Sequence, residues 1–274
     1  MSNKRNCLIC NIESNMLMND TILGKYKIDY YLCLDCKCIF TEEPYWLEEA
    51  YKNPIVVTDT GIMERNLAIC DALMKIFNHY FNENVKVLDY AGGYGILTRL
   101  LRDRGVDAYW HDIYTTNLLA RGFEYDGKSK VDVILAFEVL EHLPNPLEAI
   151  IEIMSKTDCF VFSTQFLDKY DYKSNKDWWY FIPESGQHIF FLSNTAIKKL
   201  ATLINCNYTT VNGLHILYRN IEFKAIEKNS KIKDLMLRVS NKIQNHYTVP
   251  SKFKSKVWDD HLLMKSKMNT NENR

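Results

Sequence analysis

Hydrophobic and polar positions along the middle of the chain follow two different periods. Nearly continuous apolar runs, typical of strands buried on both faces, occupy residues 85–90, 106–113, 131–137 and 158–164. Elsewhere apolar positions recur at helical spacing, which predicts helices at 95–104 and 147–155 and a longer one at about 61–82. Strands that alternate with helices in this way indicate an α/β fold with a doubly wound, Rossmann-like parallel sheet.

The sheet is predicted to end in an antiparallel hairpin. Two alternating segments, CNYTTV at 206–211 and LHILYRN at 214–220, are separated by an Asn-Gly pair. Asn-Gly tolerates the positive φ angles of a two-residue turn, so it favours a β-hairpin. A helix at 194–204 is predicted in front of the hairpin, after an irregular, aromatic-rich insert at 165–188.

Cysteines cluster near the N-terminus, where five of the eight lie within the first 38 residues. Two C-x-x-C hooks, Cys7 with Cys10 and Cys33 with Cys36, are separated by 22 residues. Together they offer four thiolates, which complete the tetrahedral shell of Zn²⁺ and leave no position open for water. We therefore expect a structural zinc knuckle. Cys38 is expected to point to the other side of its strand and to pack in the core.

Charge divides the chain further. The whole chain balances 34 Lys and Arg against 34 Asp and Glu, so its overall field does not favour nucleic acid as a partner. Residues 222–274, however, carry 12 basic against 6 acidic side chains.

Three regions are predicted: the knuckle at 1–43, a ligand-binding α/β domain at 44–221 and a basic helical extension at 222–274. With no N-terminal apolar leader and no run of ~20 apolar residues, a cytoplasmic protein is expected.

A glycine-rich turn at 91–95 follows the first predicted parallel strand. In doubly wound sheets ligands bind beyond the carboxyl ends of the strands, where amide groups of the next helix face them. The spacing differs from the G-x-G-x-x-G of dinucleotide sites, and Asp89 at the strand end would repel a pyrophosphate. A ligand with an amino or sulfonium group is predicted instead. Asp112, at the tip of the next strand, is suited to two ribose hydroxyls and so indicates a nucleoside.

These motifs resemble those of class I S-adenosylmethionine-dependent methyltransferases. The similar stretches are Asp89-Tyr-Ala-Gly-Gly-Tyr-Gly95, Asp112 and the run VDVILAFEVLEHLPNP, within about residues 60–220. The cysteine knuckle resembles the N-terminal zinc module of sugar C-methyltransferases and of related enzymes of surface-glycan (capsule or lipopolysaccharide) pathways. The string PESGQHIFFLS is similar to the E-H-x-S-x-F-S segment of that branch.

The resemblance implies a set of residues that bind S-adenosylmethionine. Asp89, Tyr90 and the turn residues Ala91, Gly92, Gly93 and Gly95 would hold its methionine end. Asp112 would take the ribose, Asp126 the adenine amino group, and Ala136, Phe137 and Glu138 would close over the reactive methyl. Ala91 stands where the family has its first glycine, and its methyl group fits if the residue keeps a negative φ angle.

Methyl transfer to a hydroxyl group also needs a positioned base and an acceptor pocket. His188 is the first candidate base and His142 the second, although His188 could serve as a structural hydrogen-bonding residue and His142 as a helix cap. The candidate acceptor contacts are aromatic: Trp178, Trp179 and Tyr180 in the insert, of which at least one is expected in the core, and Tyr45 and Trp46 beside the knuckle.

The sequence thus predicts a methyltransferase that acts on a sugar, nucleotide sugar or glycan precursor. O-methylation is favoured because Gln187 stands where C-methyltransferases have a glutamate beside the histidine. The alternatives are C-methylation of a keto-sugar nucleotide, RNA methylation through the zinc ribbon and basic tail, a non-catalytic S-adenosylmethionine-binding module, and a nicotinamide oxidoreductase. The sequence identifies neither the acceptor nor the oligomeric state.

Overall fold

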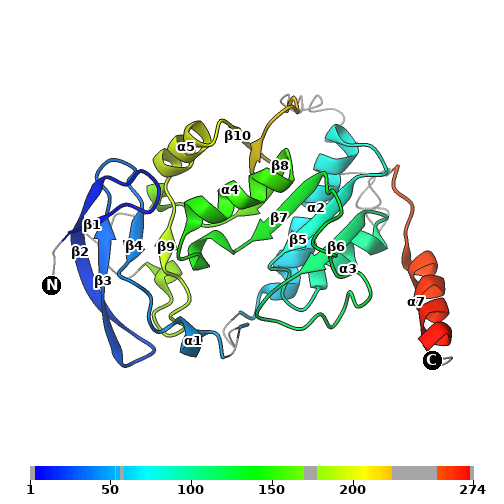
Figure 1. The fold of residues 1–274 in the computed structure, drawn as a ribbon, viewed down its shortest axis with the longest axis horizontal. Helices are drawn as coiled ribbons and strands as arrows, with labels where there is room; N and C mark the ends of the chain where they lie inside the picture. Colours follow the sequence, from blue (N-terminus) through cyan, green and yellow to red (C-terminus); the bar gives the residue numbers. More distant parts are fainter. Residues whose placement is uncertain (1–3, 53, 56–58, 170–177, 224–251, 272–274) are drawn as a thin grey trace, which may run out of the picture.

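The chain forms two β-sheets that lie side by side, as Figure 1 shows for a computed structural model. The structure describes residues 4–52, 54–55, 59–169, 178–223 and 252–271. Among these residues, no helix combines the length and apolarity needed to cross a membrane.

The larger sheet has six strands in the order β10-β11-β8-β7-β5-β6. Four of them are parallel: β5 (Lys86–Tyr90), β6 (Asp107–His111), β7 (Val133–Phe137) and β8 (Cys159–Ser163). The predicted hairpin, β10 (Asn207–Val211) and β11 (Leu214–Tyr218), adds to β8 in antiparallel orientation. The predictions of a mostly parallel sheet and of the terminal hairpin are confirmed.

Helices cover both faces of this sheet because the strand side chains alternate. Leu88, Ile134 and Phe160 pack toward α4 (Pro146–Lys156) and α5 (Asn194–Leu203). The neighbouring positions Val87, Leu135 and Val161 pack toward α2 (Ile62–Tyr80) and α3 (Ile96–Asp103). These helices begin and end within two residues of the predicted bounds.

The smaller sheet is antiparallel, in the order β1-β2-β3-β4-β9. Its strands are β1 (Lys4–Asn6), β2 (Glu13–Ile22), β3 (Tyr26–Leu32), β4 (Ile39–Thr41) and β9 (Phe190–Phe191). β9 lies just after the insert, so the N-terminal sheet contains a strand from the α/β region. The short helix α1 (Leu47–Ala50) follows β4.

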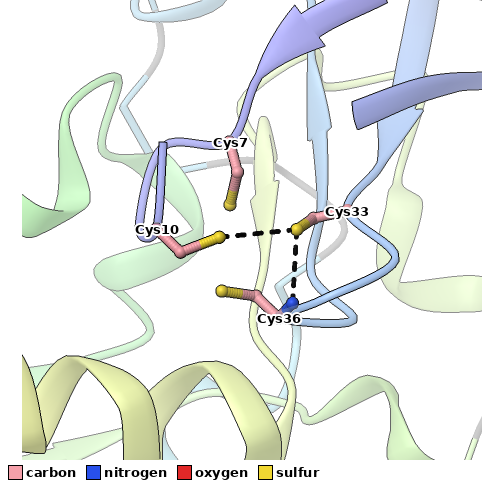
Figure 2. Close-up of side chains that lie close together, drawn as sticks. All are labelled: Cys7, Cys10, Cys33 and Cys36. Atoms are coloured by element: carbon pink, nitrogen blue, oxygen red, sulfur yellow. Dashed lines mark hydrogen bonds between the residues drawn. The ribbon is translucent and has the colours of Figure 1, made fainter. Parts of the chain in front are cut away.

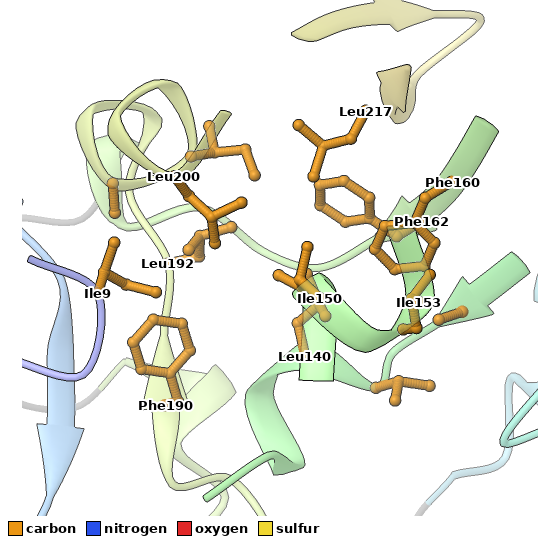
Figure 3. Close-up of a cluster of buried hydrophobic side chains, with 14 of the residues drawn as sticks. Ile9, Leu140, Ile150, Ile153, Phe160, Phe162, Phe190, Leu192, Leu200 and Leu217 are labelled. Carbon is orange, nitrogen blue, oxygen red and sulfur yellow. The ribbon is translucent and has the colours of Figure 1, made fainter. Parts of the chain in front are cut away.

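One buried cluster joins the two sheets. Ile9 of the N-terminal module lies near Phe190 and Leu192, and the same cluster continues through Leu140 and Ile150 to the large sheet (Figure 3). The cysteine module is therefore packed onto the α/β core rather than suspended from it.

The C-terminal helix α7 (Val257–Asn271) lies at the opposite end of the molecule from β1–β4 (Figure 1). Its Asp260 accepts hydrogen bonds from Nε and Nη2 of the buried Arg102, at 2.8 and 2.7 Å, and from Arg99 at 2.9 Å. An acidic residue thus anchors the predicted basic extension. Residues 224–251 of that extension lie outside the described residues.

Candidate active site

A cavity of about 760 Å³ opens at the carboxyl ends of β5, β6 and β7, within the size range of small-molecule sites. Four segments supply most of its lining: the turn after β5, residues 111–115 after β6, residues 137–144 after β7, and part of the insert between 179 and 188. The glycine turn, the FEVLEH run and the QH segment, which were singled out separately in the sequence, therefore meet at one cavity.

The turn after β5 has an unusual backbone. Ala91 adopts φ 56°, Gly93 φ 56° and Gly95 φ 84°, so all three lie in the left-handed region. The expectation that Ala91 keeps a negative φ angle is therefore wrong, and this alanine is held in a strained conformation. A glycine is needed at position 92 because the backbone there lies close to two side chains. A Cβ at Gly92 would lie 2.8 Å from Oδ2 of Asp89 and from Cδ1 of Trp110.

The variant Ala91→Gly is expected to raise the free energy of unfolding by about 1 kcal/mol, because glycine removes the left-handed strain at a modest entropic cost. Urea unfolding monitored by circular dichroism measures this change. The matched control is Ala149→Gly within α4, which is expected to lower stability by about 1 kcal/mol. A loss of stability in both variants would contradict the strain at Ala91.

Asp89 lies beneath the turn and lines the cavity, although only 3% of it is exposed. Its Oδ2 accepts a hydrogen bond of 2.8 Å from the Thr98 hydroxyl. Burial raises the pKa of Asp89 to about 7, against the opposing effect of the Thr98 hydrogen bonds. The carboxylate is thus poised to lose its proton when a cation lies near it.

Asp112 lines the cavity at the end of β6, and backbone groups hold its carboxylate. Oδ2 accepts from the Gly93 amide at 3.0 Å, and Oδ1 accepts from the amides of Tyr114 and Thr115 at 2.7 and 2.9 Å. Asp112 therefore ties the glycine turn to the loop after β6, and its Oδ2, which accepts only one of these hydrogen bonds, keeps acceptor capacity for a ligand.

Of the other predicted cofactor contacts, Tyr90, Phe137 and Glu138 line the cavity, but Ala136, Gly95 and Asp126 do not. Ala136 is fully buried in the core. A Cβ at Gly95 would meet Oδ1 of Asn117 at 2.7 Å, so that glycine permits packing of the loop. Asp126 is exposed and caps its own turn, because it accepts hydrogen bonds from the amides of Lys128 and Ser129. The structure does not bring Asp126 to the site.

The two candidate histidines lie together at the cavity. Their ring centroids are 4.8 Å apart, and both rings line the cavity wall. Nδ1 of His142 donates to the carbonyl of Gln187 at 3.1 Å, and Nδ1 of His188 donates to the carbonyl of Tyr180 at 2.6 Å. Because a carbonyl only accepts, each neutral ring carries its proton on Nδ1 and its lone pair on Nε2.

Burial keeps these two rings uncharged. It lowers the pKa of His142 to about 4 and, together with the neighbouring His142, lowers that of His188 to about 3. Both Nε2 lone pairs are therefore available as hydrogen-bond acceptors at neutral pH.

Two glutamates converge on one hydroxyl beside the histidines. The Tyr180 hydroxyl lies 2.8 Å from Oε2 of Glu138 and within hydrogen-bond distance of Oε1 of Glu141. Oε1 of Glu138 accepts from the Ser163 hydroxyl at 2.7 Å. Burial and the nearby charge of Glu138 raise the pKa of Glu141. Glu138 adopts φ 54°, and strain of this kind in a non-glycine residue is frequent at functional sites.

The predicted acceptor aromatics divide into two groups. Trp179 is 68% exposed and lines the cavity, as does the buried Tyr180. Trp178 packs against the core, which agrees with the expectation that one of the three is structural. Trp46 is 1% exposed and donates from Nε1 to the carbonyl of Gly186 at 2.8 Å, so it holds the insert in place.

Tyr45 does not line the cavity either; it packs edge-on against Trp46 and Tyr26. The prediction that Tyr45 and Trp46 close the site is therefore wrong. Tyr51 and Tyr114, which no sequence motif marks as site residues, stack at the cavity wall with 4.4 Å between ring centroids and an interplanar angle of 12°. Glu141 was not predicted as a site residue either, although it stands next to His142 in the FEVLEH run.

The charged side chains of the cavity lining are predominantly acidic. Among the described residues it carries five carboxylates, those of Asp59, Asp89, Asp112, Glu138 and Glu184, against the single guanidinium of Arg65. That guanidinium is itself paired with Asp59 at 2.9 and 2.7 Å. Such a lining favours cationic or neutral ligands over polyanions.

The cysteines of the two hooks point toward one another at the edge of the small sheet (Figure 2). The Sγ atoms of Cys7, Cys10, Cys33 and Cys36 all lie within 4.8 Å of one another. The two hooks also form the same turn. Asn11 and Lys37, each following its second cysteine, have φ 57° and 60°, and their amides donate to the carbonyls of Cys7 and Cys33 at 3.0 and 2.9 Å.

The prediction for Cys38 is right about packing in the core but wrong about direction, because the side chain does not point away from the hooks. Its side chain is fully buried with the cluster, and its Sγ lies 3.4 Å from Sγ of Cys7. The positive φ angle of Lys37 turns the backbone between Cys36 and Cys38, so the simple alternation of an extended strand does not apply. A hydrogen bond from the Cys38 thiol lowers the pKa of Cys33 to about 4.

The small sheet is connected directly to the histidines. The Thr41 amide donates to the carbonyl of Ile189 at 3.0 Å, and the Ile189 amide donates to the carbonyl of Glu141 at 2.8 Å. Ile189 follows His188, and the next two residues form β9. The N-terminal module therefore helps to position both sides of the histidine pair.

Comparison with known proteins gives one family match. Residues 63–211, more than half of the chain, match the family model described as "Methyltransferase domain". No curated protein matches the chain.

Solved structures with a similar fold include three methyltransferases. The magnesium protoporphyrin IX methyltransferase of Synechocystis PCC 6803, with bound SAH, is 17% identical over 62% of this chain and 90% of that chain, with a TM-score of 0.43. An O-methyltransferase family protein from Burkholderia thailandensis is 14% identical over 61% and 58%, with a TM-score of 0.44. Human N-acetylserotonin methyltransferase in complex with SAM is 13% identical over 64% and 65%, with a TM-score of 0.38. At these values nothing about the acceptor follows from the likeness.

Proposed function

The chain belongs to the methyltransferase-domain family and is an S-adenosylmethionine-dependent methyltransferase, and from this premise we propose that it methylates a hydroxyl group of a sugar unit in a glycan precursor. One observation supports a hydroxyl acceptor above all. Two neutral imidazoles, His142 and His188, line the same cavity as the glycine turn and keep their Nε2 lone pairs available. A hydroxyl group is the donor that such a pair of acceptors fits.

We assign the methyl donor, S-adenosylmethionine, to the side of the cavity formed by the glycine turn. S-adenosylmethionine, when bound, supplies an electrophilic methyl group on a sulfonium. Asp89 and the turn residues 91–93 would hold its methionine end, and Asp112 would accept hydrogen bonds from the ribose. The acidic lining supports this assignment because it stabilises a cationic ligand.

The residues of the chain then have three tasks in the transfer. The walls exclude water and hold the acceptor oxygen in line with the methyl group, at about 3 Å. The Nε2 atom of His188 or His142 accepts the hydrogen of the acceptor hydroxyl as the oxygen gains its new bond. The carbonyls of Tyr180 and Gln187 fix both rings in the tautomer that this requires.

The sugar part of the proposal rests on the aromatic surfaces of the cavity and on the resemblance of the sequence to the sugar-methyltransferase branch. Trp179 and the stacked pair of Tyr51 and Tyr114 offer flat faces of the kind on which sugar rings pack. The acidic lining disfavours a diphosphate inside the cavity, so a nucleotide sugar would keep that group outside. The same lining argues against RNA as the acceptor.

Mass spectrometry tests this function. The protein is incubated with S-adenosylmethionine carrying a labelled methyl group and with two pools, neutral glycosides and nucleotide sugars. The proposal predicts a labelled product that has gained one CH₂ group, with the label on oxygen and with no deuterium taken up at a substrate carbon when the reaction is run in D₂O. Labelled RNA as the sole product, or label bound to carbon, would contradict it.

We also propose that the cysteine cluster binds a structural Zn²⁺ through Cys7, Cys10, Cys33 and Cys36. The donor set fits this ion, because zinc takes four thiolates at about 2.3 Å in a tetrahedral shell. The Ile9 amide donates to Sγ of Cys7 at 3.4 Å, and the Cys36 amide donates to Sγ of Cys33 at 3.2 Å. Such N–H groups stabilise thiolates once their protons are lost.

The variant Cys33→Ser is expected to lose the zinc and to destabilise the small sheet, whereas Cys38→Ser is expected to keep about one zinc per chain. Elemental analysis of purified proteins measures the zinc content, and thermal unfolding measures stability. Because the small sheet positions His188 through β9, Cys33→Ser is also expected to lower the transfer rate. Native protein with far less than one zinc, or loss of zinc in Cys38→Ser, would refute this ligand set.

A further inference from the structure

We propose that Glu141, His142 and His188 form a second metal site, which binds a divalent cation of the first transition row at the acceptor end of the cavity. One oxygen of Glu141 and one nitrogen of each histidine lie within 4.8 Å of one another. Two imidazoles and one carboxylate form a common donor set for such ions when other coordination positions stay open. This inference deepens the proposed function, on which it rests for its role but not for the binding itself.

The backbone holds both histidines as metal ligands are usually held. A ligating histidine typically donates its other ring N–H to a carbonyl or carboxylate, which fixes the tautomer and the direction of the lone pair. Here both Nδ1 atoms donate to carbonyls, those of Gln187 and Tyr180, and both Nε2 atoms carry lone pairs. Both rings line the open cavity, so an ion and its remaining ligands can reach them.

Glu141 supplies an independent observation. The residue is fully buried, and among the described residues its Oε2 has no hydrogen-bond partner. Its other oxygen, Oε1, lies against the Tyr180 hydroxyl. A buried carboxylate oxygen without a partner is costly, and a cation between Glu141 and the two histidines would satisfy it.

The surroundings of Glu141 contain more hydrogen-bond acceptors than hydrogen-bond donors. The single Tyr180 hydroxyl proton is shared between Glu138 and Glu141, and in the part of the chain that the structure describes neither glutamate forms a salt bridge. Among the described residues, the cavity lining adds further carboxylates and one guanidinium. The local field therefore attracts a cation to this end of the cavity.

The nitrogen and oxygen ligands distinguish this site from the cysteine cluster, whose ligands are all sulfur. A bound cation would withdraw electron density from an acceptor hydroxyl at an open position and lower the hydroxyl pKa, so that its proton leaves to solvent water before the acceptor is enclosed. The acceptor oxygen then forms its bond to the methyl carbon as the sulfur–methyl bond breaks, and sulfur keeps the electron pair. In this state His142 and His188 hold the cation instead of accepting the hydroxyl hydrogen.

Titration with Mn²⁺ tests the site directly, because Mn²⁺ prefers nitrogen and oxygen ligands and leaves thiolate sites to zinc. Free Mn²⁺ is measured by electron paramagnetic resonance in solutions of the full chain. We expect one Mn²⁺ per native chain and at least about tenfold weaker binding in Glu141→Gln and His188→Asn. His215→Asn, a substitution outside the cavity lining, is the matched control and should bind as the native chain does.

Calorimetric titration with S-adenosylmethionine shows whether each variant is folded. A native chain that binds no Mn²⁺, or variants that bind S-adenosylmethionine and Mn²⁺ as the native chain does, would overturn the metal site. The proposed function is judged separately by methyl transfer. Transfer without Mn²⁺ binding would remove the site and keep the function, whereas Mn²⁺ binding without transfer to any sugar would keep the site and remove the function.

Discussion

Replacement of His188 by asparagine is expected to lower kcat/KM for methyl transfer by about 10²- to 10⁴-fold, the usual contribution of a positioned acid–base group. The asparagine amide can still donate to the carbonyl of Tyr180 in place of Nδ1, but it has no atom that replaces Nε2. The variant therefore removes the lone pair that faces the cavity and preserves the hydrogen bond that orients the segment. Initial rates with labelled S-adenosylmethionine and a saturable acceptor provide the measurement.

The affinity of His188→Asn for S-adenosylmethionine should stay within about twofold of the native value, because the donor is assigned to the other side of the cavity. His215→Asn should show the native kcat/KM. If His188→Asn transferred methyl groups at the native rate, neither a hydrogen-accepting role nor a metal-binding role for this histidine would survive. Equal losses of rate in His188→Asn and His215→Asn would show a general structural effect.

Replacement of Asp89 by asparagine is expected to weaken the binding of S-adenosylmethionine about 10- to 100-fold at pH 8, which corresponds to roughly 1.5–3 kcal/mol for a charge-assisted interaction. The two side chains have the same shape, and the amide oxygen can still accept the Thr98 hydroxyl. The variant thus removes the charge and keeps the packing beneath the glycine turn. Isothermal titration calorimetry measures the affinity, and an unchanged value would refute the role assigned to the carboxylate.

Asp89→Asn is expected to weaken ligand binding but not to lower the stability of the fold, so a measurement of stability serves as a control for the binding experiment. Burial raises the pKa of Asp89 to about 7, so the folded chain binds a proton more tightly than the unfolded chain does. The stability that Asp89 contributes is therefore present at low pH and is lost as the pH rises through 7. At pH 8 the asparagine variant should unfold at the same temperature as the native chain or at a higher one, and weaker binding cannot then be attributed to unfolding.

Much of the α/β region could be predicted from local patterns. Strands β7 and β8 are almost entirely apolar, β5 and β6 are apolar at their centres, and the Asn-Gly pair between β10 and β11 specifies a tight turn regardless of what surrounds it. β9 could not be predicted, because a two-residue strand carries no periodic signal and forms only when Phe190 and Phe191 meet β4.

The site was predictable where the chemistry is local. Asp89, the glycine turn, Asp112 and both histidines lie in short motifs, and the topology of a parallel sheet brings them to one edge. Predictions that depended on tertiary packing were wrong. Trp46 donates its indole N–H to the carbonyl of Gly186, which is far away in the sequence, and is therefore buried outside the cavity. Cys38 lies in the cysteine cluster because Lys37 has a positive φ angle.

The pH dependence of S-adenosylmethionine binding tests most directly the claim that the carboxylate beneath the 91–93 turn attracts a cationic methyl donor. With a pKa of about 7 in the free protein, Asp89 is mostly protonated at pH 6 and mostly ionised at pH 8. Calorimetric affinities are measured at both pH values for the native chain and for Asp89→Asn, so that the titration of the ligand itself is common to both. We predict that the native affinity rises about tenfold more than that of the variant between pH 6 and pH 8. Parallel behaviour of the two proteins would contradict the claim.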